Sequence, residues 1–266
     1  MKLQPDLLPA RLFLGAGQLE LGEFNKAADS LALVVAANPQ ERNARLMLGE
    51  ALFGMGRPVD AVTHLEAAAE MLPTNPRVWY ALGRAYQTLG RDPAGAWDKL
   101  HALPPSIESH LHAAQVHDAA QRWREAAVEW RAAIEKPAAR IGLAWSLFRA
   151  RDYGAAMTAL KPLLASGGDD VQFLYGASLL NQQQPEAAIP YLRAAVTLIS
   201  ARSALGQALL QTGKPEEAIP LLKDGLAADT DGTVHFQLYR AYQLTHREAE
   251  AREALAAYKR SRTGKI

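Results

Sequence analysis

Histidine is the residue type whose clustering in this sequence first suggests chemistry. Four of the seven histidines, His101, His110, His112 and His117, lie within one short stretch. Two metal ligands on one face of a helix need a spacing of three or four residues, whereas His112 and His117 are five apart. His110 and His117 are two helical turns apart, about 10 Å. We therefore expect no metal site, and we expect His110 and His117 to pack as half-polar core residues.

Other residue patterns that could support catalysis are absent from the sequence. Phosphate-binding glycine loops, nucleophile elbows and HExxH motifs do not occur, and the chain has no cysteine. The paired carboxylates of Glu216 and Glu217 follow Lys214 and Pro215, where acidic residues in a first helical turn interact favourably with the helix dipole. The sequence therefore indicates a protein that is not an enzyme and needs no cofactor.

Composition and charge exclude further classes. The 266 residues include 29 Lys and Arg against 28 Asp and Glu, a net charge of +1, which argues against nucleic acid as a partner. The chain is 49% hydrophobic, too apolar for disorder. Charged residues interrupt its apolar stretches before they reach membrane-spanning length, so we expect no direct membrane insertion.

A pattern recurs along the chain with a period of about 34 residues. Residues 79–90 read WYALGRAYQTLG, which places Trp79, Leu82, Gly83 and Tyr86 on the spacing W-x2-L-G-x2-Y. Related segments are LGEAL at 48–52, LGQAL at 205–209 and LYRAY at 238–242. Recurrence of one motif predicts a stack of similar structural units.

The second half of each repeat carries an alanine followed by a large apolar residue one helical turn later. The pairs are Ala27 with Leu31, Ala61 with Leu65, Ala188 with Leu192, and Ala218 with Leu222. Small residues in the first half, at Gly49, Gly83 and Gly206, would let a second helix approach closely. Each repeat is therefore expected to form two antiparallel helices.

These motifs resemble the tetratricopeptide repeat family over nearly the whole chain. The resemblance implies an all-α fold, a right-handed α-α superhelix of about eight helix-turn-helix repeats that start near residues 8, 42, 76, 107, 137, 169, 199 and 232. We expect a single array over residues 1–266, with an irregular, shortened junction near 91–110 that contains Pro104 and Pro105.

The resemblance also implies a concave groove lined by outward-facing positions of the first helices, where a peptide or partner protein would bind. Carried over residue by residue, these positions are Leu12, Leu46, Glu50, Phe53, Tyr80, Arg84, Gln87, Gln115, Trp145, Phe148, Phe173, Gln207, Phe236 and Arg240. Many are aromatic, and aromatic side chains beside arginine are common in peptide-binding hot spots. A frame error of one residue would instead place them in the core.

A subgroup of the family binds C-terminal carboxylates through Lys at the fifth and Asn at the ninth position of its first unit. This chain has Leu12 and Ala16 there, so that carboxylate clamp is absent. The expected function is a scaffold without enzymatic activity that binds a protein or peptide in the groove. Two alternatives stay open: a structural or oligomerisation module of a longer or envelope-assembly protein, as bacterial relatives provide, and the targeting part of a multidomain enzyme.

The first helix is unusually apolar, with Leu7, Leu8, Leu12, Phe13 and Leu14 close together. They are either core residues or a surface for self-association or for stacking on upstream repeats. Asp6 and Arg11 interrupt this segment, so it does not fit a signal peptide. We expect a cytoplasmic protein, or a periplasmic one if the chain is an excised fragment.

Overall fold

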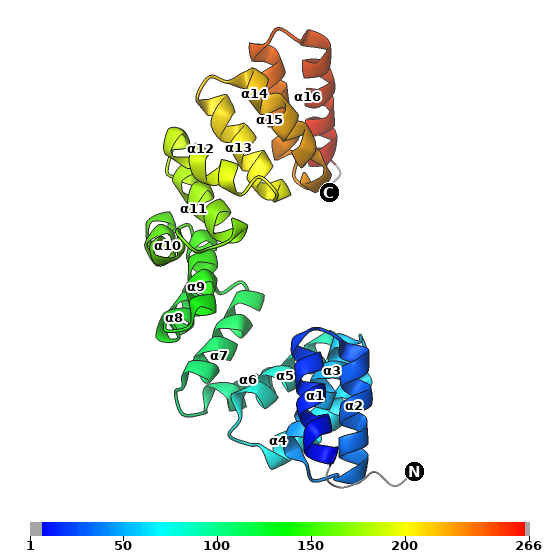
Figure 1. Cartoon of the computed structure of the whole chain (residues 1–266). Helices are drawn as coiled ribbons and strands as arrows, with labels where there is room; N and C mark the ends of the chain where they lie inside the picture. The colour runs from blue at the N-terminus through cyan, green and yellow to red at the C-terminus, as the bar shows by residue number, and fades with distance from the viewer. Residues whose placement is uncertain (1–6, 264–266) are drawn as a thin grey trace. The chain divides into compact units, whose positions relative to one another are not determined.

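The computed structural model describes residues 7–263, and over that range the chain forms sixteen α-helices and no strand (Figure 1). The helices divide into two compact units, Met1–Ala133 and Ile134–Ile266, called unit 1 and unit 2 below. Asp6, considered above in the signal-peptide prediction, lies outside the described range, as do the rest of residues 1–6 and residues 264–266. The expected all-α class is confirmed.

Unit 1 contains four helix pairs. Its helices are α1 (Leu8–Glu20), α2 (Phe24–Ala37), α3 (Arg42–Gly54), α4 (Pro58–Met71), α5 (Pro76–Thr88), α6 (Ala94–His101), α7 (Ile107–Ala119) and α8 (Trp123–Ala132). Each helix packs against the next one along the chain, and α1, α3, α5 and α7 also pack against one another in sequence. Helix α6 has only 8 residues, against 14 in α4.

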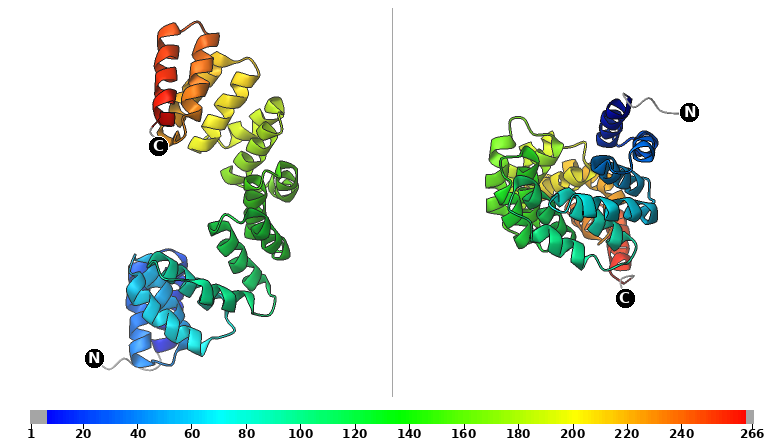
Figure 2. Two further views of the ribbon diagram at one scale, coloured as in Figure 1. Left: turned by 180° about the vertical axis from the view of Figure 1, so that it is seen from behind. Right: turned by 90° about the horizontal axis from the view of Figure 1, so that it is seen from below.

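Unit 2 repeats the arrangement. Its helices are α9 (Pro137–Arg149), α10 (Tyr153–Leu160), α11 (Asp169–Asn181), α12 (Pro185–Ala194), α13 (Ile199–Gln211), α14 (Pro215–Gly225), α15 (Thr233–Leu244) and α16 (Glu248–Thr263), with single 3₁₀ turns at Lys161–Leu163 and Leu226–Ala228. Figure 2 shows α15 and α16, in orange and red, side by side, as their packing requires.

The predicted starts of the repeats agree with the helices. The first helices begin at Leu8, Arg42, Pro76, Ile107, Pro137, Asp169, Ile199 and Thr233, so only the last differs from the prediction, by one residue. Proline at the first position explains several of these starts, because a helix leaves the first N–H groups unbonded in any case. The helix-turn-helix repeats are therefore confirmed, while the single array over residues 1–266 stays a prediction.

One residue in the left-handed backbone region closes the turn between the two helices of every repeat. These residues are Gly22, Gly56, Gly90, Gln121, Arg151, Gln183, Gly213 and His246, with φ between 58° and 76°. Each lies at the fifteenth position of its repeat when counted from the predicted starts. Half of the turns use glycine, which reaches this region without steric cost, and the other half use residues with a side chain.

Close contact between the two helices of a repeat depends on a residue without a side chain. A Cβ atom on Gly49 would lie 2.6 Å from Cγ of Leu65, and one on Gly206 would lie 2.7 Å from Cγ of Leu222. Leu65 and Leu222 are fully buried. The small residues predicted from the sequence thus allow the leucine of the second helix to fill the space.

The motif residues in the third repeat join α5 to its neighbours. Trp79 Nε1 donates to the carbonyl oxygen of Pro73 at 2.8 Å, and the Tyr86 hydroxyl donates to Glu66 Oε1 at 2.7 Å. Burial together with the neighbouring Glu66 carboxylate raises the pKa of Tyr86 to about 12. Helix α5 is therefore held in place by side-chain hydrogen bonds as well as by its apolar face.

Candidate functional site

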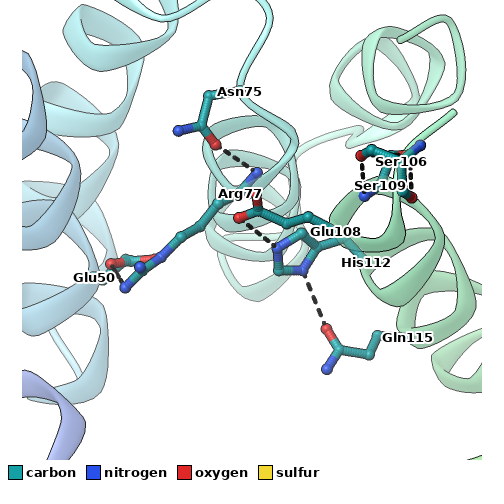
Figure 3. Close-up of polar contacts among 8 residues, drawn as sticks. All are labelled: Glu50, Asn75, Arg77, Ser106, Glu108, Ser109, His112 and Gln115. Carbon is teal, nitrogen blue, oxygen red and sulfur yellow. Dashed lines mark hydrogen bonds and ion pairs between the residues drawn. The ribbon is translucent and has the colours of Figure 1, made fainter. Parts of the chain in front are cut away.

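Six of the predicted site residues come from three first helices of unit 1. These are Glu50 and Phe53 on α3, Tyr80, Arg84 and Gln87 on α5, and Gln115 on α7. Figure 3 shows how polar caps fix the two later helices: Asn75 Oδ1 accepts from the Arg77 N–H at 2.9 Å, and Ser106 and Ser109 exchange hydrogen bonds of 3.0 and 2.8 Å. Such caps set the start of a helix and so the direction of its side chains.

A cleft of about 380 Å³ opens between α3 and α5, and we call it the Phe53 cleft. Its lining includes Leu19, Phe24, Phe53, Tyr80, Glu50 and Arg84. Apolar and aromatic surfaces dominate, with a few polar groups at the edge, which is the usual composition of a ligand-binding site. The structure thus brings four of the predicted site residues into one cleft.

Arg84 lies across the aromatic rings of this cleft. Its guanidinium carbon is 5.0 Å from the centre of the Phe53 ring and 5.8 Å from the centre of the Tyr80 ring. Both distances fall within the range of cation–π attraction. Burial raises the pKa of the Tyr80 phenol, and the Arg84 charge opposes that rise.

A second arginine of the cleft is neutralised within the protein. Arg77 donates through two nitrogens to both carboxylate oxygens of Glu50, at 2.6 and 2.7 Å (Figure 3). Burial raises the pKa of Glu50 above its ordinary value, although the hydrogen bond and charge of Arg77 act in the opposite direction. This forked pair connects α3 to α5 and fixes the polar edge of the Phe53 cleft.

His112 connects α7 to the same face. Its ring stacks on Tyr80 with 4.6 Å between centroids, its Nδ1 lies 3.4 Å from Gln115 Oε1, and its Nε2 lies 3.9 Å from Glu108 (Figure 3). Burial lowers the pKa of His112, and Arg77 lowers it further, whereas Gln115 and Glu108 raise it. The neutral ring is therefore the form that suits this stack.

A second cleft of about 350 Å³ lies beside the first, and we call it the Arg122 cleft. Tyr80 and Arg84 line both clefts. The Arg122 cleft adds Gln87 and Gln115 from the predicted set, together with Trp97 and Arg122, which the prediction missed. The six predicted residues named above therefore line one or both of two neighbouring clefts, whereas Leu12 and Leu46 line neither.

In unit 2 the predicted aromatic residues form a chain of ring contacts. Trp145 lies 6.2 Å from Phe148 and 6.1 Å from Phe173, measured between ring centroids, and Phe148 lies 5.3 Å from Tyr153. All four side chains are half-buried. Tyr153 belongs to a second helix, so a search restricted to first helices could not find it.

The last predicted residues of unit 2 lie apart from that chain of rings. Phe236 is 40% exposed, and its ring lies 6.0 Å from Tyr239 and 5.1 Å from Tyr258. Arg240 is exposed and Gln207 is half-buried, and neither belongs to the two ring clusters. The predicted aromatic residues of unit 2 therefore fall into two separate clusters, and Gln207 and Arg240 lie outside both.

Two aliphatic residues assigned to the groove have other positions. Leu46 is only 4% exposed and is part of the core of unit 1, so its assignment was wrong. Leu12 is partly buried against the same core. The physical reason is that the first helices of neighbouring repeats pack side by side. At the fifth position of a repeat, Leu46 fills this contact, whereas the longer Tyr80 extends beyond it.

The histidine cluster has no metal-ligating arrangement. Among residues 7–263, no group of three or more His, Cys, Asp or Glu side chains could hold an ion. His110 Nδ1 lies 2.7 Å from Glu129 Oε2, and the His117 ring lies 5.4 Å from that of His101. In the same range, no helix has both the length and the apolar character needed to cross a membrane.

Comparison with solved structures supports the fold. A chain in the crystal structure of the APC/C heterotetramer Cut9–Hcn1 superposes with a TM-score of 0.66 and 17% identity, over 95% of this chain and 49% of that one. This chain thus spans about half the length of that relative. A tetratricopeptide repeat protein from Parabacteroides merdae ATCC 43184 has a TM-score of 0.57 and 14% identity, over 89% of this chain and 99% of that one.

Comparison with sequence families gives the assignment. No curated protein matches the sequence. One family model described as tetratricopeptide repeat matches residues 18–82 and 52–95, and a second with the same description matches residues 141–202 and 203–264. The matches together cover well over half of the chain, in the same repeats that the helices form, and the chain therefore belongs to the tetratricopeptide repeat family.

Proposed function

We propose that this chain is a protein-binding scaffold, without catalytic activity of its own, whose unit 1 binds an extended peptide segment of a partner protein. Tetratricopeptide repeats generally mediate protein–protein interactions, and the relative in the Cut9–Hcn1 structure is itself part of a complex. The observation that carries the proposal is the Phe53 cleft, where Phe53, Tyr80 and Arg84 offer aromatic surface and a cation to one ligand.

The side chains of the Phe53 cleft are of the types that contribute most to binding energy. Aromatic and arginine side chains in desolvated clefts account for most of the binding energy in typical interfaces. Tyr80 is held by its stack on His112, and Arg84 by the two rings beneath it. Because these side chains are already ordered, binding loses less conformational entropy.

The test is a photo-crosslinking experiment with the full chain. A benzophenone amino acid at Gln87, which is exposed and lines the Arg122 cleft, should crosslink a partner in lysate, and the same group at the exposed Val128 of α8 should not. Tyr80→Ala should abolish that crosslink without changing the thermal unfolding of the protein, whereas Val59→Ala, an exposed change on α4, should preserve it. Equal crosslinking from Gln87 and Val128 would contradict binding at the clefts.

The aromatic chain of unit 2 is a second candidate binding surface, confined to that unit. Trp145 and Phe173 come from the first helices of successive repeats, as Phe53 and Tyr80 do in unit 1. We expect Trp145→Ala to reduce partner binding and to leave the fold intact. If Trp145→Ala unfolds the protein as severely as a charge in the core, the ring belongs to the core and its assignment to the binding surface is wrong.

Self-association through α1 is a second candidate function, and a specific observation favours it. Phe13, Leu14 and Leu21 are 77%, 53% and 78% exposed. One repeat later, the residue equivalent to Leu14 is Leu48, which is only 4% exposed because the preceding helix pair covers it. The corresponding apolar side chains of α1 are exposed in the described residues.

Light scattering separates this candidate from the scaffold function. A second copy that covers α1 would give twice the monomer mass at micromolar concentration, and the double change Phe13→Ser and Leu21→Ser would restore the monomer. Val59→Ser, which removes an equally exposed apolar side chain from α4, is the matched control. A monomer at all accessible concentrations would exclude self-association through this face.

A further inference from the structure

We propose that the Arg122 cleft is a subsite for an acidic side chain, so that the segment bound by unit 1 carries Asp or Glu close to a large apolar residue. This inference rests on the proposed function and specifies the chemistry of its ligand. The apolar side chain would occupy the Phe53 cleft, and the carboxylate would bind between Arg84 and Arg122.

The composition of the Arg122 cleft is the first argument. Its lining contains two guanidinium groups, Arg84 and Arg122, and two side-chain amides, Gln87 and Gln115. It contains no carboxylate. Guanidinium groups bind carboxylates through paired, charge-assisted hydrogen bonds, and amide N–H groups can complete the shell.

Both arginines of the Arg122 cleft keep their charge available. Neither Arg84 nor Arg122 takes part in any of the ion pairs formed within residues 7–263, whereas Arg77 is neutralised by Glu50. Asp118, four residues before Arg122 in the sequence, accepts a hydrogen bond from Trp130 Nε1 at 2.7 Å. The positive charge of the cleft is therefore left for a group from outside.

Aromatic side chains form the wall of the Arg122 cleft, while its polar groups Arg84, Arg122, Gln87 and Gln115 are exposed and accessible to a ligand. Arg84 rests on Phe53 and Tyr80, and the rings of Tyr80 and Trp97 lie 6.3 Å apart along the wall. Aromatic walls lower the local dielectric constant, which strengthens an ion pair relative to one in open solvent. An ordered guanidinium also loses little freedom on binding.

The two clefts share Tyr80 and Arg84, so one short stretch of peptide can reach both. The lining of the two clefts extends from Leu19 near the end of α1 to Ala119 at the end of α7. A ligand that occupies both clefts therefore spans several helices. For this reason we assign the carboxylate to an internal Asp or Glu side chain and not to a chain terminus.

The probe is a library of random dodecapeptides displayed inside a phage coat protein, so that no peptide has a free C-terminus. Selected on the full chain, the peptides should be enriched in Asp or Glu next to Leu, Phe or Met. For a selected peptide made synthetically, the combined change Arg84→Gln and Arg122→Gln should raise Kd at least tenfold. Arg124→Gln, which removes an exposed charge two residues away and outside the cleft, should leave Kd unchanged.

A double-mutant cycle assigns the contact. Replacing the peptide's Asp or Glu with the amide should weaken binding to the natural chain, and should have no further effect on the Arg122→Gln variant. Additive losses would overturn the subsite. So would tighter binding of a phosphoserine peptide than of the acidic one, because the site would then be a phosphate site.

The outcomes also separate the inference from the function on which it rests. If peptides are selected whose binding needs Tyr80 but is unaffected by both Arg→Gln changes, unit 1 binds peptides and the acidic subsite is wrong. If no selected peptide is weakened by Tyr80→Ala, the proposed function fails as well. Thermal unfolding of each variant, monitored by circular dichroism, shows that the exposed arginines were removed without loss of fold.

Discussion

Single residues in the left-handed region determine the turns of this protein, and their cost can be measured. Gly22 lies in the turn after α1 with φ of 73°, whereas Gly17 lies within α1. A Cβ atom added to either glycine would meet no other atom within 4 Å. Gly22→Ala should therefore lower the free energy of unfolding by about 1 kcal/mol through backbone strain alone. Hydrogen exchange of the α1 and α2 amides would report the loss.

Gly17→Ala is the matched control for that change. Both positions are exposed and belong to the same repeat, but Gly17 has helical backbone angles. Alanine is the better helix former, so Gly17→Ala should raise stability by about 0.5 kcal/mol. Effects of the same sign at both positions would contradict the assignment of the turn.

Three half-buried histidines give the stability of the protein a pH dependence. Burial lowers the pKa of His112, His64 and His117 below the ordinary value of 6.5. Below pH 6.5 the unfolded chain then binds more protons than the folded one. The contribution of these histidines to the free energy of unfolding is therefore complete above that pH and is lost as the pH falls through their lowered folded-state pKa values. Urea unfolding at pH 7.5 and 5.5 should show the decrease.

His112→Phe should make that decrease smaller. Phenylalanine preserves a ring against Tyr80 but cannot be protonated. The groups that face His112 are Gln115, Glu108 and Arg77, and the variant leaves all three in place. An unchanged difference between the two pH values would mean that His112 does not contribute, and that His64 and His117 account for the effect.

At the scale of helices, pairs of small and large residues hold each repeat together. Ala61 is fully buried between the two helices of its repeat, while Thr63 on the same helix is exposed. Ala61→Glu would bury an unpaired carboxylate and should destabilise the repeat by about 3 kcal/mol or more. Urea titration of Thr63→Glu should show almost no change, and equal midpoints for the two variants would refute the helix frame.

The helices could be predicted from the sequence because their determinants are local and periodic. Gly49, Leu65 and their equivalents recur at fixed positions, and proline marks several helix starts. The position of Leu46 could not be derived in this way. Whether the fifth residue of a first helix is buried depends on its size and on the neighbouring helix. The position of a residue within its repeat gives no information on either.

At the scale of the whole molecule, the contacts of each helix are almost entirely with its neighbours along the chain. Stability of such a protein is close to a sum of repeat and interface terms, so damage should stay local. Ala218→Glu in unit 2 should abolish amide protection in α13 and α14 and leave α1 to α4 unchanged. Hydrogen exchange that speeds up equally in all helices would show instead that the molecule unfolds as one.

The candidate site could be predicted only in part, because its clefts are formed by several repeats together. The repeat frame placed Tyr80, Arg84, Gln87 and Gln115 on one surface, and the structure brings them to adjoining clefts. It missed Arg122, which lies in a turn, and Trp97 and Tyr258, which lie on second helices. Clefts between repeats are lined by residues from several elements, so their lining cannot be predicted from one fixed position in each repeat.

The left-handed residue at the same place in all eight repeats has a consequence for how such a gene can change. The φ angle of this residue stays between 58° and 76° whether it is glycine, glutamine, arginine or histidine, so the turn keeps this conformation despite different side chains. Recombination that copies or deletes one repeat in register would join segments that already fit. The chain can therefore gain or lose whole repeats without a new kind of turn between the helices.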